Sequence, residues 1–125
     1  MIMSLVIPGA YAQEKGSTDD LSALGIDTSH GVDVGDIVIR DPFVLVSDGI
    51  YYMYGTGAST AAGYGCYVSL DLETWYGPVN VFEAKEGFDG VNCFWAPECH
   101  YYNGKYYLLA SYGSASTGHR GTSVF

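Results

Sequence analysis

The chain has 125 residues, of which 48% are hydrophobic and 15% charged, so it is one modest domain rather than a disordered polar chain. Its Lys and Arg number 5 against 14 Asp and Glu, which gives a formal net charge of −9. This balance argues against nucleic acid and anionic membranes as partners, since both require clustered cations. No apolar run approaches the roughly 20 residues that span a bilayer. A neutral ligand fits better, and sugars are the largest such class.

The residue types favour an all-β chain. Tyrosine, a strand-favouring residue, occurs 12 times, and glycine, a turn former, occurs 17 times. The odd number of cysteines excludes a complete disulfide framework, and their spacing fits no common zinc site. We therefore expect small buried thiols at Cys66, Cys93 and Cys99.

Residues 1–36 differ in amino-acid composition from the rest of the chain. Residues 1–12 are apolar and end in Ala10-Tyr11-Ala12, the form of a signal-peptidase site, but they lack a basic region. Two interpretations stay open: a truncated signal peptide, which predicts a secreted or periplasmic protein, or a ragged start. Residues 13–36 are polar and rich in Gly, Ser and Asp, which predicts an irregular leader.

Short runs of Val, Ile, Tyr and Phe begin at Ile37. They predict a strand over 42–47, a hairpin turn at Ser47-Asp48-Gly49 and a partner strand over 50–54. Two further strands are predicted over 65–69 and 78–82. Together these form one four-stranded unit.

The chain also repeats itself at an offset of 55 residues. Residues 40–53 fall on 95–108 without a gap, which pairs Pro42 with Pro97, Asp48-Gly49 with Asn103-Gly104, and Tyr51-Tyr52 with Tyr106-Tyr107. A four-stranded unit at this period is typical of a β-propeller blade, so residues 37–125 predict a partial β-propeller of about two blades. Since propellers close with about four to eight blades, we expect the chain to be a fragment. The alternative is a β-sandwich whose hairpins resemble one another.

Two carboxylates stand at corresponding places in the repeat. Asp41 precedes the first proline, and Glu98 follows the second, at the level of Phe43. Two residues are one period of a strand, so both carboxylates are expected to face the propeller axis. Convergent carboxylates suit acid/base hydrolysis of a glycosidic bond. The alternative is that each is a solvated acid at a strand start, because Asp before Pro is a common turn initiator.

Three motifs in order carry a family resemblance: Arg40-Asp41-Pro42, then Ser69 to Trp75 followed by Gly77-Pro78, then Phe94-Trp95-Ala96-Pro97-Glu98. Over about residues 36–125 the chain resembles glycoside hydrolase family 43. The resemblance implies a five-bladed β-propeller that acts with inversion on arabinose- or xylose-containing polysaccharides. Its partner is then a carbohydrate.

The resemblance also implies roles for single residues. Asp41 matches the general base that deprotonates the attacking water. Glu98 matches the carboxylate that orients the general acid and raises its pKa by like-charge repulsion, although the family has Asp there. The general acid belongs to a third blade, beyond this chain, and Glu83 and Glu86 precede the second blade and do not replace it. This fragment alone is therefore expected to be inactive.

Aromatic residues near these carboxylates are candidates for substrate binding. Trp95 is suited to stack on a sugar ring or to pack between blades, and Phe43 lines the cavity or the core. His100 shares the strand parity of Glu98, and a structural role is favoured for it. Calcium occupies the central channel of some family members, but no ligand set is identifiable here, so no metal or cofactor is assigned.

Three other interpretations remain. Ser69, Asp71 and Trp75 resemble the Asp-box of sialidases, but the motif is one residue too short and lacks its Gly, so Asp71 is predicted to be a turn residue and Trp75 a packing residue. A carbohydrate-binding propeller without catalysis and an inactive gene fragment are the alternatives to an enzyme.

Overall fold

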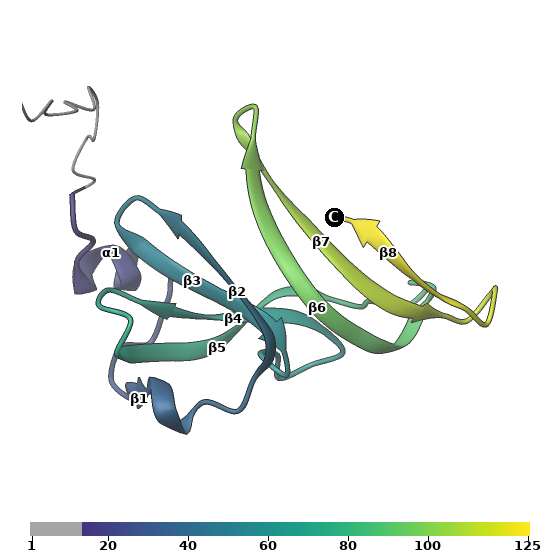
Figure 1. Ribbon diagram of the computed structural model, residues 1–125, viewed down its shortest axis with the longest axis horizontal. Coiled ribbons are helices and arrows are strands. Elements are labelled where there is room, and N and C mark those ends of the chain that lie inside the picture. The colour runs from purple at the N-terminus through teal and green to yellow at the C-terminus, as the bar shows by residue number, and fades with distance from the viewer. Residues whose placement is uncertain (1–13) are drawn as a thin grey trace, which may run out of the picture.

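The computed structural model describes residues 14–125, which form two antiparallel sheets (Figure 1). The proposed signal peptide at residues 1–12 lies outside the described residues. The two sheets meet where strand β6 packs against β2 and β3. Figure 1 shows helix α1 beside the first sheet and β8 on the side of the second sheet away from it. The prediction of an all-β partial propeller is confirmed, with each sheet corresponding to one blade.

The first blade contains the four predicted strands in sequence order. These are β2 (Arg40–Ser47), β3 (Ile50–Thr56), β4 (Gly63–Ser69) and β5 (Thr74–Glu83), each paired with the next. The strands at 65–69 and 78–82 are longer than predicted, because β4 begins at Gly63 and β5 at Thr74. A two-residue strand, β1 (Val32–Asp33), pairs with β5 and adds a fifth strand at that edge.

The second blade, as described, has three strands. Strand β6 (Gly90–Tyr102) pairs with β7 (Lys105–Ser114), which pairs with β8 (Arg120–Val124). The two hairpin turns, which lie 55 residues apart, have the same backbone conformation. Both central residues of each hairpin turn have positive φ, with 51° and 73° at Asp48 and Gly49 and 48° and 80° at Asn103 and Gly104. These values are typical of the type I′ turn, whose twist matches that of the paired strands.

The predicted irregular leader, residues 13–36, contains short regular elements within the described residues 14–36. Helix α1 (Thr18–Ala23) begins at Ser17, which exchanges capping hydrogen bonds with Asp20, and a 3-10 helix (Val34–Asp36) follows β1. Leu21 and Ile26 reach the hydrophobic core. The helix has only 6 residues and one buried side chain, so no apolar periodicity marked it in the sequence.

The core lies between the blades and is aromatic. Tyr64 of β4 packs its ring 5.5 Å from that of Phe94 and 5.5 Å from that of Phe125. Burial raises the pKa of Tyr64 to about 12, and its phenol donates a hydrogen bond to the carbonyl of Ser111 in the second sheet at 2.8 Å. The two blades therefore share one core.

The segment between β4 and β5 is a turn, as predicted. Asp71 accepts hydrogen bonds from the backbone amides of Glu73 and Thr74, at 2.9 and 2.8 Å, and these bonds lower the pKa of its carboxyl. Trp75, 2% exposed, is buried beneath the turn and donates from its indole to the carbonyl of Leu72. Both residues therefore hold the blade together, Asp71 in the turn and Trp75 by packing, as predicted.

Gly65 provides a stability test. A Cβ at this position would overlap the carbonyl oxygen of Ala58 and lie 2.7 Å from that of Val79. We expect Gly65→Ala to lower the free energy of unfolding by about 2–3 kcal/mol, since both obstacles are backbone. Gly121→Ala is the matched control, because a Cβ there meets nothing within 4 Å. Urea unfolding measures the stability of both variants. Equal stabilities would contradict the close contact between Gly65 and these two carbonyl groups.

The cysteines differ in exposure: Cys66 and Cys99 are buried, as predicted, whereas Cys93 is half-buried. All three are free thiols. Burial raises the pKa of Cys66 to about 12, so its reactive thiolate is scarce at pH 8. We expect a thiol reagent at pH 8 to label Cys93 first in the folded chain. Mass spectrometry of labelled peptides reads the order, and unfolding in urea should make all three equally reactive. Rapid labelling of Cys66 in the folded chain would contradict its burial.

Candidate functional site

Asp41 lies in a bulge near the start of β2, the inner strand of the first blade. Arg40 pairs with Thr56 and Phe43 with Tyr54, so three steps along β2 oppose two along β3. The extra residue places Asp41 in the left-handed region, with φ of 52°, which Asp tolerates better than most residues. The bulge leaves Asp41 exposed at the end of the sheet.

A hydrogen-bonded chain connects Asp41 to the second blade. The hydroxyl of Thr56 donates to Oδ2 of Asp41 at 3.0 Å. The backbone amide of Ala96, in β6, donates to the same hydroxyl at 2.8 Å. This link fixes the carboxylate of one inner strand relative to the backbone of the other.

The bulge recurs in the second blade. Trp95 pairs with Ser111 and Glu98 with Leu109, again with one extra residue, and Ala96 takes φ of 45°. The repeat thus places Ala96, not Glu98, at the position equivalent to Asp41. Pro97 is buried behind the bulge.

The bulge corrects the argument from strand alternation. Asp41 and Phe43 were expected to share a face because they are two residues apart, but the extra residue interrupts the alternation between them. Asp41 is exposed, whereas Phe43 packs against the hydrophobic core. Of the two roles considered for Phe43, the structure therefore shows packing in the core.

Glu98 forms a pair with His100 on β6. Nε2 of His100 lies 3.1 Å from Oε2 of Glu98, and both side chains are about half exposed. The His100 ring also lies 4.9 Å from that of Phe43, measured between ring centroids. The expected shared face of Glu98 and His100 is confirmed, and it borders the inner strand of the first blade. No hydrogen bond among residues 14–125 joins Asp41 directly to Glu98.

Trp95 is surrounded by positive charge. Its side chain is 37% exposed, and the guanidinium carbons of Arg120 and Arg40 lie 4.7 and 6.0 Å from the ring centroid. These are the two arginines of the chain. Both contacts fall within cation–π range, so the indole ring organises the charged side chains of β2 and β8.

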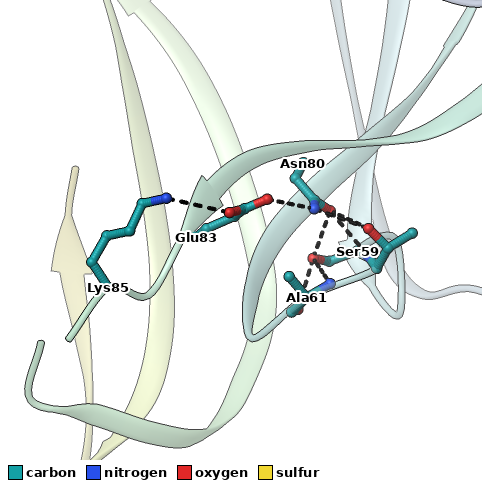
Figure 2. A network of polar contacts seen from close by, with 6 residues as sticks. Ser59, Ala61, Asn80, Glu83 and Lys85 are labelled. Atoms are coloured by element: carbon teal, nitrogen blue, oxygen red, sulfur yellow. Dashed lines mark hydrogen bonds and ion pairs between the residues drawn. The ribbon is translucent and has the colours of Figure 1, made fainter.

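A polar network secures the loop beside this end of the first blade (Figure 2). Asn80 of β5 accepts hydrogen bonds from Ser59 and from the amide of Thr60, at 3.0 and 2.9 Å, and donates to Glu83 at 2.9 Å. Lys85 reaches the other oxygen of Glu83 at 3.5 Å. The bonds from Asn80 and Lys85 lower the pKa of Glu83. An ionised Glu83 is unsuited to serve as a general acid, which must stay protonated.

Asp89, at the start of the second blade, is also unsuited to act as an acid. Its carboxylate accepts hydrogen bonds from the hydroxyl of Ser114 and the amide of Ser116, and these lower its pKa. It tethers the turn between β7 and β8, which leads to Arg120.

The candidate site lies on a surface of the described chain rather than in its main cavity. A cavity of about 650 Å³ lies between the sheets near the β2–β3 turn, with an apolar lining that includes Leu45, Tyr52 and Leu108. It contains none of the predicted site residues. Asp41, Trp95 and Glu98 are each exposed, so the candidate site lies at the surface of the described chain.

Among residues 14–125, no three His, Cys, Asp or Glu side chains are grouped closely enough to hold a metal ion. In the same part of the chain, no helix is long and apolar enough to cross a membrane.

Two residues of the site escaped the sequence analysis: Thr56 and Arg120. A signal for Thr56 was present. Counting outward from the hairpin turn, where Ser47 pairs with Ile50, places Thr56 opposite Asp41, and the bulge shifts this register by one residue only. Counting residues from a hairpin turn does not place Arg120 beside Trp95 in the same way. That contact depends on the length of the β7–β8 turn.

The fold and site define two adjacent propeller blades with an exposed carboxylate on the first inner strand. Residues 34–125 match the family described as Glycosyl hydrolases family 43. The chain belongs to this family. No curated protein sequence matches the chain.

Solved structures agree with this assignment. An endo-arabinase from Bacteroides thetaiotaomicron is 36% identical with a TM-score of 0.67, over 77% of this chain and 33% of that one. A thermostable family-43 glycoside hydrolase is 32% identical with a TM-score of 0.58, over 69% and 28%. An endo-arabinanase from Bacillus licheniformis is 25% identical with a TM-score of 0.57, over 71% and 32%. The chain therefore spans about a third of the length of these structures.

Proposed function

We propose that the full-length protein is an inverting glycoside hydrolase acting on arabinose-containing polysaccharides. The observation that carries the proposal is the exposed carboxylate of Asp41, anchored through Thr56 at the start of the first inner strand. Family membership supports glycosidase chemistry, and two solved structures described as an endo-arabinase and an endo-arabinanase support arabinose as the sugar.

Asp41 is assigned the role of general base. Its free oxygen takes a proton from a water molecule while that water attacks the anomeric carbon, and a general acid on the opposite side protonates the departing glycosidic oxygen. Glu83 and Asp89 do not fill the acid role, because hydrogen bonds lower their pKa values. A residue of a third blade is proposed as the acid.

Glu98 is assigned the role of pKa modulator. A carboxylate near the acid favours its protonated form, so the acid stays ready to donate near neutral pH. The contact with His100 fixes Oε2 of Glu98, which leaves the other oxygen to face the acid.

Trp95 is proposed to border the substrate. An indole that is 37% exposed, with two guanidinium groups over its ring, combines apolar surface with hydrogen-bond donors, which suits a sugar ring and its hydroxyls. Phe43 acts indirectly, by supporting the His100 ring. Xylose-containing chains remain a second substrate class, and export remains a proposal on the basis of Ala10-Tyr11-Ala12. Calcium binding in the full-length protein is likewise a proposal.

Removing the base tests the central role. In the full-length protein, Asp41→Asn should lower kcat on linear arabinan by about a hundred- to ten-thousandfold, because the amide cannot take a proton from water. Asp36→Asn is the matched control: this exposed acid lies five residues upstream in the 3-10 helix. Reducing-sugar release measures both. Near-native turnover by Asp41→Asn would remove Asp41 from the base role, and sugar binding without turnover by the wild-type protein would favour a carbohydrate-binding module.

Removing the charge of Glu98 tests the second role. Glu98→Gln should lower activity and move the alkaline limb of the kcat/KM profile to lower pH, because the acid loses the neighbouring charge that raises its pKa. Glu86→Gln makes the same substitution at an exposed position before the second blade. If both variants keep the alkaline limb of the wild type, Glu98 does not modulate the acid.

A further inference from the structure

We propose that Thr56 is a positioning residue for the general base, acting through Asp41 rather than on the substrate. The inference rests on the function proposed above, since it assigns Thr56 a task in the reaction of Asp41. Thr56 is the last residue of β3, and its hydroxyl lies between the two inner strands.

The direction of both hydrogen bonds follows from the chemistry of the groups. A backbone amide can only donate, so the hydroxyl of Thr56 must accept from Ala96, at 2.8 Å. Its single proton is then available for Oδ2 of Asp41, at 3.0 Å. An ionised carboxylate can only accept, so the arrangement satisfies all three groups. The Ala96 amide thus orients the hydroxyl, and the hydroxyl orients the carboxylate.

This arrangement suits a base. Asp41 is exposed, and an exposed carboxylate without a partner samples several rotamers. The bond from Thr56 holds one oxygen and leaves the other free to take the proton of a water molecule. A hydroxyl carries no charge, so it orients the carboxylate through a hydrogen bond alone.

The link also connects the inner strands of the two blades. Ala96 precedes Glu98 by two residues on β6, so the bond to Ala96 relates the base to the strand that carries the second carboxylate. Inverting hydrolysis requires a defined gap between base and acid to admit water. Thr56 therefore positions Asp41 relative to the strand that carries Glu98.

The second blade has a hydroxyl at the position equivalent to Thr56 but no carboxylate beside it. Ser111 is equivalent to Thr56 at the offset of 55 residues, and its hydroxyl donates to the carbonyl of Trp95 at 3.2 Å. Its blade has Ala96 where the first blade has Asp41. A hydroxyl at this place is thus a structural feature of both blades, and only Thr56 directs it to the proposed base.

The test compares Thr56→Val with Thr56→Ser in the full-length protein on linear arabinan. Val keeps the shape of Thr without the hydroxyl, so kcat should fall about ten- to a hundredfold while KM changes less than threefold. Ser restores the hydroxyl and should recover kcat to within about threefold of the wild type. If Thr56→Val does not fold, Thr56→Ala against Thr56→Ser makes the same comparison. Ser111→Ala is the matched control, and its kcat should exceed that of Thr56→Val at least fivefold.

Coupling to Asp41 separates this inference from the function on which it rests. In an Asp41→Asn background, adding Thr56→Val should lower the residual kcat by less than twofold, because no base remains to be positioned. Wild-type kcat in Thr56→Val, or no recovery in Thr56→Ser, would overturn the positioning role while Asp41→Asn still abolished turnover. Retained turnover in Asp41→Asn would instead overturn the proposed function.

Discussion

The link from the Ala96 amide through the Thr56 hydroxyl to Asp41 is the constraint on which the site depends. Each blade forms its own sheet, so hydrogen bonds within a sheet do not fix one inner strand against the other. The shared aromatic core holds the blades together, but apolar packing has no direction and does not orient a carboxylate. A directional bond between the strands does both, and it ends on the carboxylate that we propose as the base.

The bulges make that link available. Asp41 and Ala96 both adopt positive φ, a conformation that disfavours most side chains, and the repeat retains it in both blades. Each bulge turns its inner strand, near the start of β2 and in the middle of β6. In the first blade the turn exposes a carboxylate, and in the second it aims an amide at Thr56. One backbone feature used twice thus supplies both ends of the contact. Trp95, within the second bulge, gathers both arginines at the same place.

The sequence predicted the hairpins well because their signals are local. Asp48-Gly49 and Asn103-Gly104 specify type I′ turns, and the turns set the registers of β2–β3 and β6–β7. The bulge at Asp41 was not predictable from alternation, because it is held by Thr56 and Ala96, which are distant in the chain. The helix at Thr18–Ala23 was missed for a related reason: Leu21 is buried by the core of the blade, and its own segment is too short to show a pattern.

The anomeric configuration of the first product tests the account most directly. If Asp41 acts as a base on water, the attacking oxygen arrives opposite the leaving group, and early proton NMR spectra of an α-L-arabinoside digest should show the β-anomer before mutarotation. Initial formation of the α-anomer would mean that a carboxylate attacks the sugar directly. It would contradict the assignment of Asp41 as a base held ready for water.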